Sequence, residues 1–192
     1  AKDYEKVLSE AIAAKDSSAL EALGVKGADK AATSELARSI NNGRILFNGK
    51  ARCNGCHVGD SFSDSQFHNL GVGAKEGKLP EGMLGRFGAQ PTGQKNPELV
   101  GAFKTPHLRQ LLATAPYMHD GSIASLEQVL TQHYALAGKA SAGPNGTSPI
   151  KNETLVGFEL SAQELKDIVA FLNTLTDTQF IQNKAHSDPW KK

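Results

Sequence analysis

Apolar residues recur at the period of an α-helix in three segments of the chain, with charged or polar residues between them. The first segment covers residues 2–23 and stops at Gly24, because glycine is unfavourable inside a helix. The second runs from Thr33 to Phe47, shortly before the chain's two cysteines. The third covers residues 160–177 and has the clearest apolar face. We therefore predict amphipathic helices at these three places.

Two of the predicted helices begin with residues that favour capping. Ser161 and Glu164 have the spacing of a capping box, in which two side chains satisfy backbone N–H groups of the first turn. Thr33 or Ser34 is predicted to cap the N-terminus of the second helix. These capping residues support the prediction of both the second and the third helix.

The rest of the chain has weaker patterns. A short helix is predicted at residues 106–114 and a longer one at residues 122–136. Residues 59–104 are rich in glycine and proline and show no sustained period, so they are predicted to be a long loop that either carries function or wraps around another group. No alternating run is long enough to predict a strand. Together the patterns predict an all-α fold with long loops.

The composition indicates a bound apolar group. Of the 192 residues, 39% are apolar and 6% aromatic, while 19 glycines and 8 prolines indicate many turns. A hydrophobic cofactor would let such a chain form a core. The net charge of +1 argues against a nucleic-acid surface, which needs a clustered excess of lysine and arginine. No apolar run in the sequence approaches the roughly 20 residues that span a membrane.

The chain's only cysteines lie in the stretch Cys53-Asn54-Gly55-Cys56-His57. Cys-x-x-Cys-His is the pattern of covalent haem attachment. Each thiol can form a thioether with one vinyl group of the porphyrin, and the small residues between them allow a tight turn beneath the ring. His57 then lies under the iron and is predicted to bind it through Nε2 as the proximal ligand. We predict one covalently bound haem c.

Three other uses of the cysteine pair fit less well. A disulfide between Cys53 and Cys56 would close a very short loop and stabilise little. A thioredoxin-type redox pair needs a strand before it and a helix after it, whereas a helix is predicted before and a loop after. A zinc site needs further ligands, and the chain has no other cysteine. Because haem is attached to cytochromes outside the bacterial cytoplasm, we expect a periplasmic or otherwise exported protein, as the polar start AKDYEKVL also allows.

The second axial ligand of the iron separates electron carriers from catalysts. Carriers have a histidine or methionine there, whereas catalysts have an open or tyrosine-blocked distal side. The residues of the chain that could take this position are His68, Met83, His107, Met118, His119, His133 and Tyr134.

Three stretches of the sequence resemble the bacterial dihaem cytochrome c peroxidase and MauG family. GAFKTPHLRQLLATAPYMHDGSIASLEQVL, at residues 101–130, is similar to the family's F-K-T-P-x-L-R, T-A-P-Y-x-H-D-G and T-L-E-x-V elements. CNGCHVGDSFSDSQFHNLGVG, at residues 53–73, resembles its C-terminal haem segment, including the F-H-N-x-G element. ELSAQELKDIVAFLNTLT, at residues 159–176, resembles its closing helix.

The resemblance extends over about residues 36–177 and implies an all-α, cytochrome c-like fold wrapped around one haem. Residues 1–35 are then an N-terminal helical extension. Residues 178–192 are a C-terminal tail.

The resemblance also implies where the distal ligand lies. Family members place it on the helix after the D-G motif, as methionine in peroxidases and tyrosine in MauG. Counting on from Leu126 without a gap puts this position at His133, which is the predicted ligand. Tyr134 replaces it if the helix is shifted by one residue. Met118, in the PYMH turn, is the other alternative.

Other positions carry over from the family more loosely. Arg109 is predicted to pair with a haem propionate, because a guanidinium forks well onto a carboxylate. His68 and His119 are predicted to hold loops by hydrogen bonds or to line the haem edge. The side chains predicted to wall the haem are Phe67, Leu108, Leu112 and Tyr117.

The resemblance leaves three functions open. The family has two haems in two domains, whereas this chain has one Cys-x-x-Cys-His motif. We therefore predict first a periplasmic monohaem cytochrome that passes single electrons between redox proteins, such as another cytochrome or a dehydrogenase. The alternative is a haem peroxidase or MauG-like oxidase with an open distal site, where His68 or His119 is the acid-base residue. The third is one haem domain of a longer multihaem protein or complex.

Overall fold

The computed structural model describes residues 10, 30–73, 79–138, 151–177, 180, 181, 183 and 185. The helix predicted at residues 2–23 therefore lies outside the described residues, apart from Glu10. The chain divides into two compact units. Unit 1 comprises Ala1–Phe47, Arg109–Thr114 and Ala162–Lys192, and unit 2 comprises Asn48–Leu108 and Ala115–Ser161.

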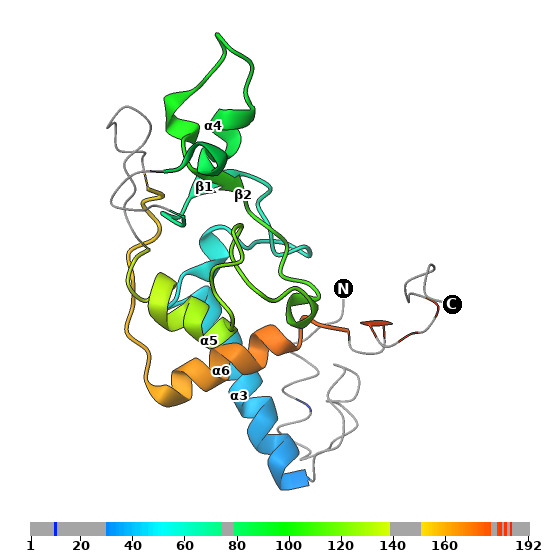
Figure 1. Ribbon diagram of the computed structural model, residues 1–192. Coiled ribbons are helices and arrows are strands. Elements are labelled where there is room, and N and C mark those ends of the chain that lie inside the picture. The colour runs from blue at the N-terminus through cyan, green and yellow to red at the C-terminus, as the bar shows by residue number, and fades with distance from the viewer. Residues whose placement is uncertain are drawn as a thin grey trace. The chain divides into compact units, whose positions relative to one another are not determined.

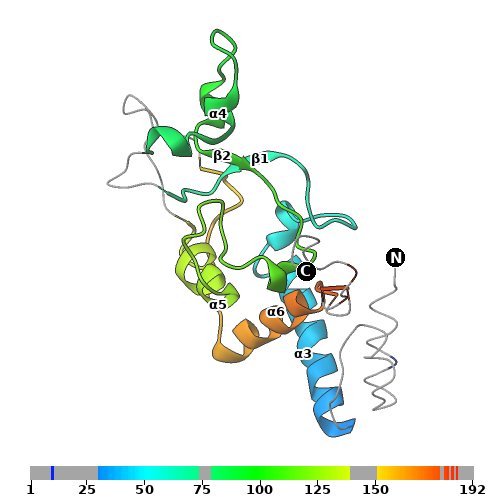
Figure 2. The same cartoon turned by 45° about the vertical axis from the view of Figure 1, so that its right-hand side comes forward.

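Unit 1 is built on two helices, α3 (Lys30–Asn48) and α6 (Ala162–Asn173), which lie across each other in both views (Figures 1 and 2). Both were predicted from their periodicity, and both predictions are confirmed. Their facing apolar residues are buried, and the rings of Phe47 and Phe171 meet edge to face with centroids 5.3 Å apart. Thr33 and Ser34 do not cap α3, because the helix begins earlier and buries both side chains.

Gly43 allows α3 and α6 to approach closely. A Cβ atom at this position would lie only 1.9 Å from the carbonyl oxygen of Asp167. The Asp167 side chain is itself buried, and its carboxylate accepts hydrogen bonds from Ser39 Oγ at 2.6 Å and Gln163 Nε2 at 2.8 Å. The crossing therefore combines a backbone contact with a satisfied buried carboxylate.

Unit 2 contains a small antiparallel sheet within the predicted loop. The strands are β1 (Phe67–Asn69) and β2 (Ala102–Lys104), and His68 pairs with Phe103 at the centre of the register. Between them lie the 3₁₀ turns η2 (Glu81–Met83) and η3 (Pro97–Leu99) and the short helix α4 (Gly85–Ala89) (Figure 1). The prediction of an all-α fold is thus wrong in this part, because strands this short leave no alternating pattern in the sequence.

The two weaker helix predictions are only partly confirmed. Residues 106–114 contain a single 3₁₀ turn, η4 (Leu111–Ala113), which lies in unit 1. In unit 2, Ser125 caps α5 (Leu126–Gln128) by accepting the Gln128 N–H, so the predicted helix starts later than residue 122. It then continues as a π-helix, η5 (Val129–Tyr134). No helix in the described ranges has both the length and the apolar character needed to cross a membrane.

η5 ends in a Schellman motif. The Gly138 N–H donates to the His133 carbonyl at 2.9 Å, and the Ala137 N–H donates to the Tyr134 carbonyl at 3.0 Å. This geometry places Ala137 in the left-handed region, at φ 60°, where glycine is usual.

We expect Ala137→Gly to raise the free energy of unfolding by about 0.5–1 kcal/mol, because it removes the Cβ strain of a left-handed alanine. Denaturant unfolding of the purified protein measures the change. The matched control is Ala135→Gly, two residues earlier in right-handed backbone, which should lower stability by about 1 kcal/mol. Equal destabilisation by both substitutions would contradict the assigned turn.

Candidate functional site

The cysteine motif follows α3 on a tight turn in unit 2. The 3₁₀ turn η1 (Cys53–Gly55) is closed by hydrogen bonds from the backbone N–H groups of Cys56 and His57 to the Cys53 carbonyl, at 3.3 and 3.0 Å. Gly55 lies against Thr154, since a Cβ added there would be 3.8 Å from the threonine Cβ. One short turn thus carries both thiols and the imidazole.

The two cysteines are held as thiols. They do not form a disulfide with each other, and both are half-buried. Burial raises the pKa of the Cys53 thiol to about 12, and burial together with the Asp64 carboxylate raises the pKa of Cys56. Both thiols are therefore protonated near neutral pH, which is the form that adds across a vinyl group with its hydrogen.

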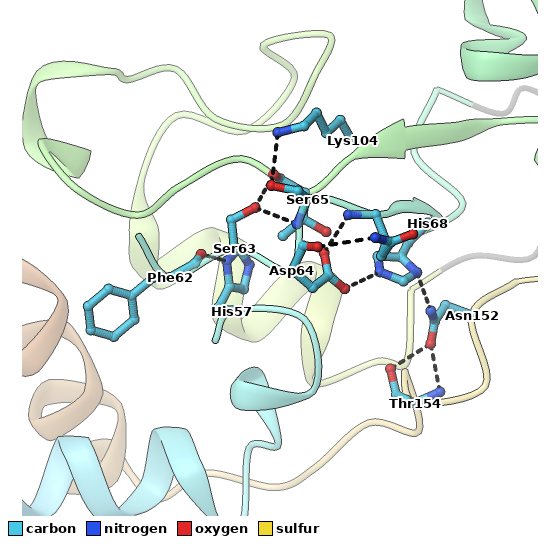
Figure 3. A network of polar contacts seen from close by, with 11 residues as sticks. His57, Phe62, Ser63, Asp64, Ser65, His68, Lys104, Asn152 and Thr154 are labelled. Atoms are coloured by element: carbon cyan, nitrogen blue, oxygen red, sulfur yellow. Dashed lines mark hydrogen bonds and ion pairs between the residues drawn. The ribbon is translucent and has the colours of Figure 1, made fainter. Parts of the chain in front are cut away.

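His57 is held in one tautomer. Its Nδ1 lies 2.8 Å from the Phe62 carbonyl oxygen and donates its hydrogen there, which leaves the lone pair on Nε2 (Figure 3). Phe62 adopts left-handed backbone at φ 53° within the loop that turns this carbonyl toward the ring. Burial lowers the pKa of His57, while the Phe62 carbonyl and the Asp64 carboxylate act in the opposite direction.

These residues fit a covalently bound haem. A neutral imidazole with its Nδ1–H engaged is the form in which histidine binds iron through Nε2. Two protonated thiols on the same turn supply the groups for two thioethers. The predicted roles of Cys53, Cys56 and His57 remain predictions, and the local chemistry suits them.

His68 joins three segments of unit 2. The Asn152 Oδ1 atom accepts hydrogen bonds from the backbone N–H and the hydroxyl of Thr154, so its Nδ2 donates to Nδ1 of His68, at 2.6 Å (Figure 3). The His68 proton therefore lies on Nε2, which donates to Asp64 Oδ2 at 2.6 Å. The prediction that His68 holds loops by hydrogen bonds is confirmed.

Cys56, Asp64 and His68 bring three metal-ligating atoms within 4.8 Å of one another, which is the arrangement that a zinc site would need. A metal on His68 Nε2 would require the proton on Nδ1. That hydrogen would point at the Asn152 Nδ2 donor, which already occupies this position. The hydrogen bonds thus favour a polar network here over a bound cation.

His133 and Tyr134 both lie on η5 but in different surroundings. His133 is 7% exposed, and a Cβ at Gly138 would be 3.4 Å from its Cε1 atom and 2.7 Å from the Leu70 carbonyl oxygen. Burial raises the pKa of Tyr134, and the nearby thiols of Cys53 and Cys56 raise it further. The Tyr134 hydroxyl therefore shares its surroundings with the cysteine motif, whereas the His133 ring lies beside Gly138.

The remaining predicted residues are more scattered. Arg109 and Leu112 belong to unit 1, and both are exposed. The pairing of Arg109 with a propionate therefore stays a prediction. Met118 lies in unit 2 in a turn with left-handed backbone, at φ 70°, and is half-buried.

The predicted wall residues Phe67, Leu108 and Tyr117 lie in unit 2 and are half-buried. The guanidinium of Arg86 lies over the Phe67 ring at 5.2 Å. His119 stacks on Phe103, with ring centroids 3.5 Å apart. The contacts of these residues with a haem stay predictions.

Sequence reasoning missed the residues that hold the site together. Phe62 acts through a backbone carbonyl, and Asn152 and Thr154 act from a segment far along the chain. Phe62 lies inside the haem segment at residues 53–73, but its backbone makes the contact, so its residue type carries no signal. Asn152 and Thr154 belong to no motif with a fixed spacing from the cysteines.

The chain is similar to haem proteins of one family. It is 35% identical over 184 residues to the cytochrome-c peroxidase IdrP1 of Denitromonas iodatirespirans, a match that covers 84% of this chain and 45% of that protein. It is 38% identical over 145 residues to the methylamine utilization protein MauG of Methylorubrum extorquens, covering 74% of this chain and 36% of that protein. The chain thus spans less than half the length of these relatives. No protein-family model matches it.

Solved structures give the same relationship. A MauG-like protein associated with microbial copper homeostasis superposes with a TM-score of 0.65 at 36% identity, over 80% of this chain and 51% of that one. A variant of the diheme peroxidase BthA from Burkholderia thailandensis has a TM-score of 0.50 at 18% identity, and shares the fold. The fold is therefore that of MauG-like proteins, helical with a small sheet. The chain belongs to the bacterial dihaem cytochrome c peroxidase and MauG family and corresponds to its C-terminal haem domain.

Proposed function

We propose that the chain is a haem-dependent oxidoreductase domain of the peroxidase and MauG kind. Its relatives are peroxidases and MauG proteins, which supports the second of the predicted functions better than a simple electron carrier. A haem bound at Cys53 and Cys56 would supply one-electron oxidation and reduction and, where its distal side opens, reaction with peroxide. The chain's own residues decide which of these reactions is accessible.

The observation that carries the proposal is the π-helix η5, which ends at Tyr134. A π-turn holds one residue more than an α-turn, and here the Ala135 N–H donates to the Leu130 carbonyl, five residues back, at 2.8 Å. The family position counted from Leu126 without a gap is His133. The extra residue moves that position on by one, to Tyr134. We therefore propose Tyr134 as the residue facing the iron, in place of His133.

The electrostatics of Tyr134 support this assignment. Its raised pKa comes from burial and from the two nearby thiols. Once Cys53 and Cys56 are thioethers they can no longer ionise, so their contribution disappears. A ferric iron held by His57 would favour the phenolate further, because a nearby cation stabilises the charged form of a tyrosine. His57, oriented by the Phe62 carbonyl, would hold the iron through Nε2.

The site also implies a location and a partner. Thioether formation at Cys53 and Cys56 requires haem ligation outside the bacterial cytoplasm, so we propose a periplasmic or otherwise exported protein. A redox protein, such as another cytochrome, would exchange electrons with the haem through a small interface.

Peroxide turnover tests the function. We expect the purified haem-loaded protein to consume hydrogen peroxide while oxidising a reduced small cytochrome over many turnovers. The variant Cys53→Ser/Cys56→Ser, which lacks both attachment thiols, is the control and should be inactive. If the haem-loaded protein instead exchanges electrons with the cytochrome but leaves peroxide unconsumed, the electron-carrier prediction holds and the proposal fails.

A further inference from the structure

The Lys151 ammonium group holds the end of η5. Its Nζ donates to the Ala137 carbonyl at 2.7 Å and to the Leu155 carbonyl at 3.2 Å, and the side chain is half-buried. The Ala137 carbonyl lies just past the C-terminus of the helix, where backbone oxygens carry partial negative charge and have no intrahelical donor. A lysine at this place therefore fixes the turn that follows Tyr134.

The next residue, Asn152, is hydrogen-bonded to strand β1. Its backbone N–H donates to the Asn69 carbonyl at 3.0 Å, and its side chain donates to Nδ1 of His68 at 2.6 Å. His68 in turn donates to Asp64, whose backbone N–H bonds to the Cys56 carbonyl at 2.8 Å. Asn152 is thus connected through two side chains to the turn that carries the cysteine motif. Figure 3 shows the links from Asn152 to His68 and from His68 to Asp64.

Two consecutive residues therefore link the segments on which the predicted proximal and distal ligands lie. Tyr134 is connected to this link by the Schellman bond from Ala137, whose carbonyl Lys151 binds. We propose that Lys151 and Asn152, the 151–152 bridge, are positioning residues that hold Tyr134 in its place relative to the cysteine motif. This inference rests on the proposed role of Tyr134 as the residue facing the iron.

The bridge acts together with one other contact. The Phe158 N–H donates to the Ala135 carbonyl at 3.2 Å and would keep the segments together when Lys151 is replaced. Loss of the bridge should thus loosen Tyr134 without unfolding the helix. Residues that orient a metal ligand commonly change metal affinity or activity by about 10-fold to 100-fold when they are removed.

The variants Lys151→Met and Lys151→Arg test the bridge. Methionine keeps the length of the stem but removes the charge and donors, whereas arginine keeps both. In the haem-loaded ferric protein we expect Lys151→Met to shift the absorption spectrum toward that of Tyr134→Phe and to raise cyanide affinity by about tenfold. Lys151→Arg should restore most of the wild-type spectrum. Lys104→Met, an exposed lysine of the same unit, is the matched control and should leave both measurements unchanged.

A second variant addresses the other half of the bridge. Asn152→Leu removes the donor to His68 and should shift the spectrum in the same direction as Lys151→Met, with near-normal circular dichroism and haem content. If Tyr134→Phe opens the site to cyanide but Lys151→Met and Asn152→Leu behave like wild type, the bridge proposal is overturned while the ligand assignment stands. If Tyr134→Phe itself leaves the spectrum and cyanide affinity unchanged, it is the assignment of Tyr134 that fails.

Discussion

Replacing Gly43 by alanine is expected to destabilise the protein by about 3 kcal/mol, near the upper end of what overpacking costs. Helix propensity alone predicts the opposite, because alanine in a helix interior is favoured over glycine by about 1 kcal/mol. The packing of unit 1 decides the sign. The new methyl group would lie 1.9 Å from the carbonyl oxygen and 2.5 Å from the carbonyl carbon of Asp167. Both are backbone atoms inside α6, so no side-chain rotation relieves the overlap.

The helices would have to separate, which would also loosen the edge-to-face pair of Phe47 and Phe171 and the Ser39–Asp167 hydrogen bond. Denaturant unfolding measures the effect. The control is Gly82→Ala, since a Cβ there meets no atom within 4 Å and should change stability by about 0.5 kcal/mol or less. A Gly43→Ala protein as stable as wild type would mean that α3 and α6 do not cross at this glycine.

Replacing Tyr134 by phenylalanine is expected to open the distal side of the haem. If the Tyr134 ligand leaves the iron free for about 1% of the time, it lowers the affinity of an exogenous ligand such as cyanide about a hundredfold. Its removal should therefore raise cyanide affinity of the ferric protein by that factor. The hydroxyl is the only group lost and the ring remains, so the packing of η5 is preserved. The wild-type ferric spectrum should contain a phenolate-to-iron charge-transfer band that the variant lacks.

His133→Gln is the matched variant for the neighbouring position. His133 is buried beside Gly138, so we expect this substitution to affect stability while the axial ligation stays as in wild type. Absorption spectra and cyanide titrations of the two variants distinguish the assignments. If His133→Gln opens the site and Tyr134→Phe does not, the π-turn does not shift the register, and the ungapped count from Leu126 is right. A spectrum altered only by Met118→Leu would point instead to the PYMH turn.

The sequence predicted well where geometry depends on near neighbours. α3 and α6 follow from apolar spacing, because a helix buries whichever face carries those residues. The cysteine motif and its histidine lie on one turn because Cys53 and His57 are only four residues apart, so the local backbone conformation fixes their relative positions. The three motifs also predicted the family, and the similar proteins confirm that prediction. The N-cap of α3 was wrong, since helix start signals compete over a few residues and packing chose an earlier start.

By itself the sequence thus determined the two long helices of unit 1 and the family, and it predicted the chemistry of Cys53, Cys56 and His57. Only the tertiary structure decided the two short strands, whose pairing joins segments more than 30 residues apart. It also decided the register of η5, because a π-turn depends on contacts that a count along the chain does not contain. The same holds for His68 and Asn152, whose hydrogen bonds form only once their distant segments have been brought together.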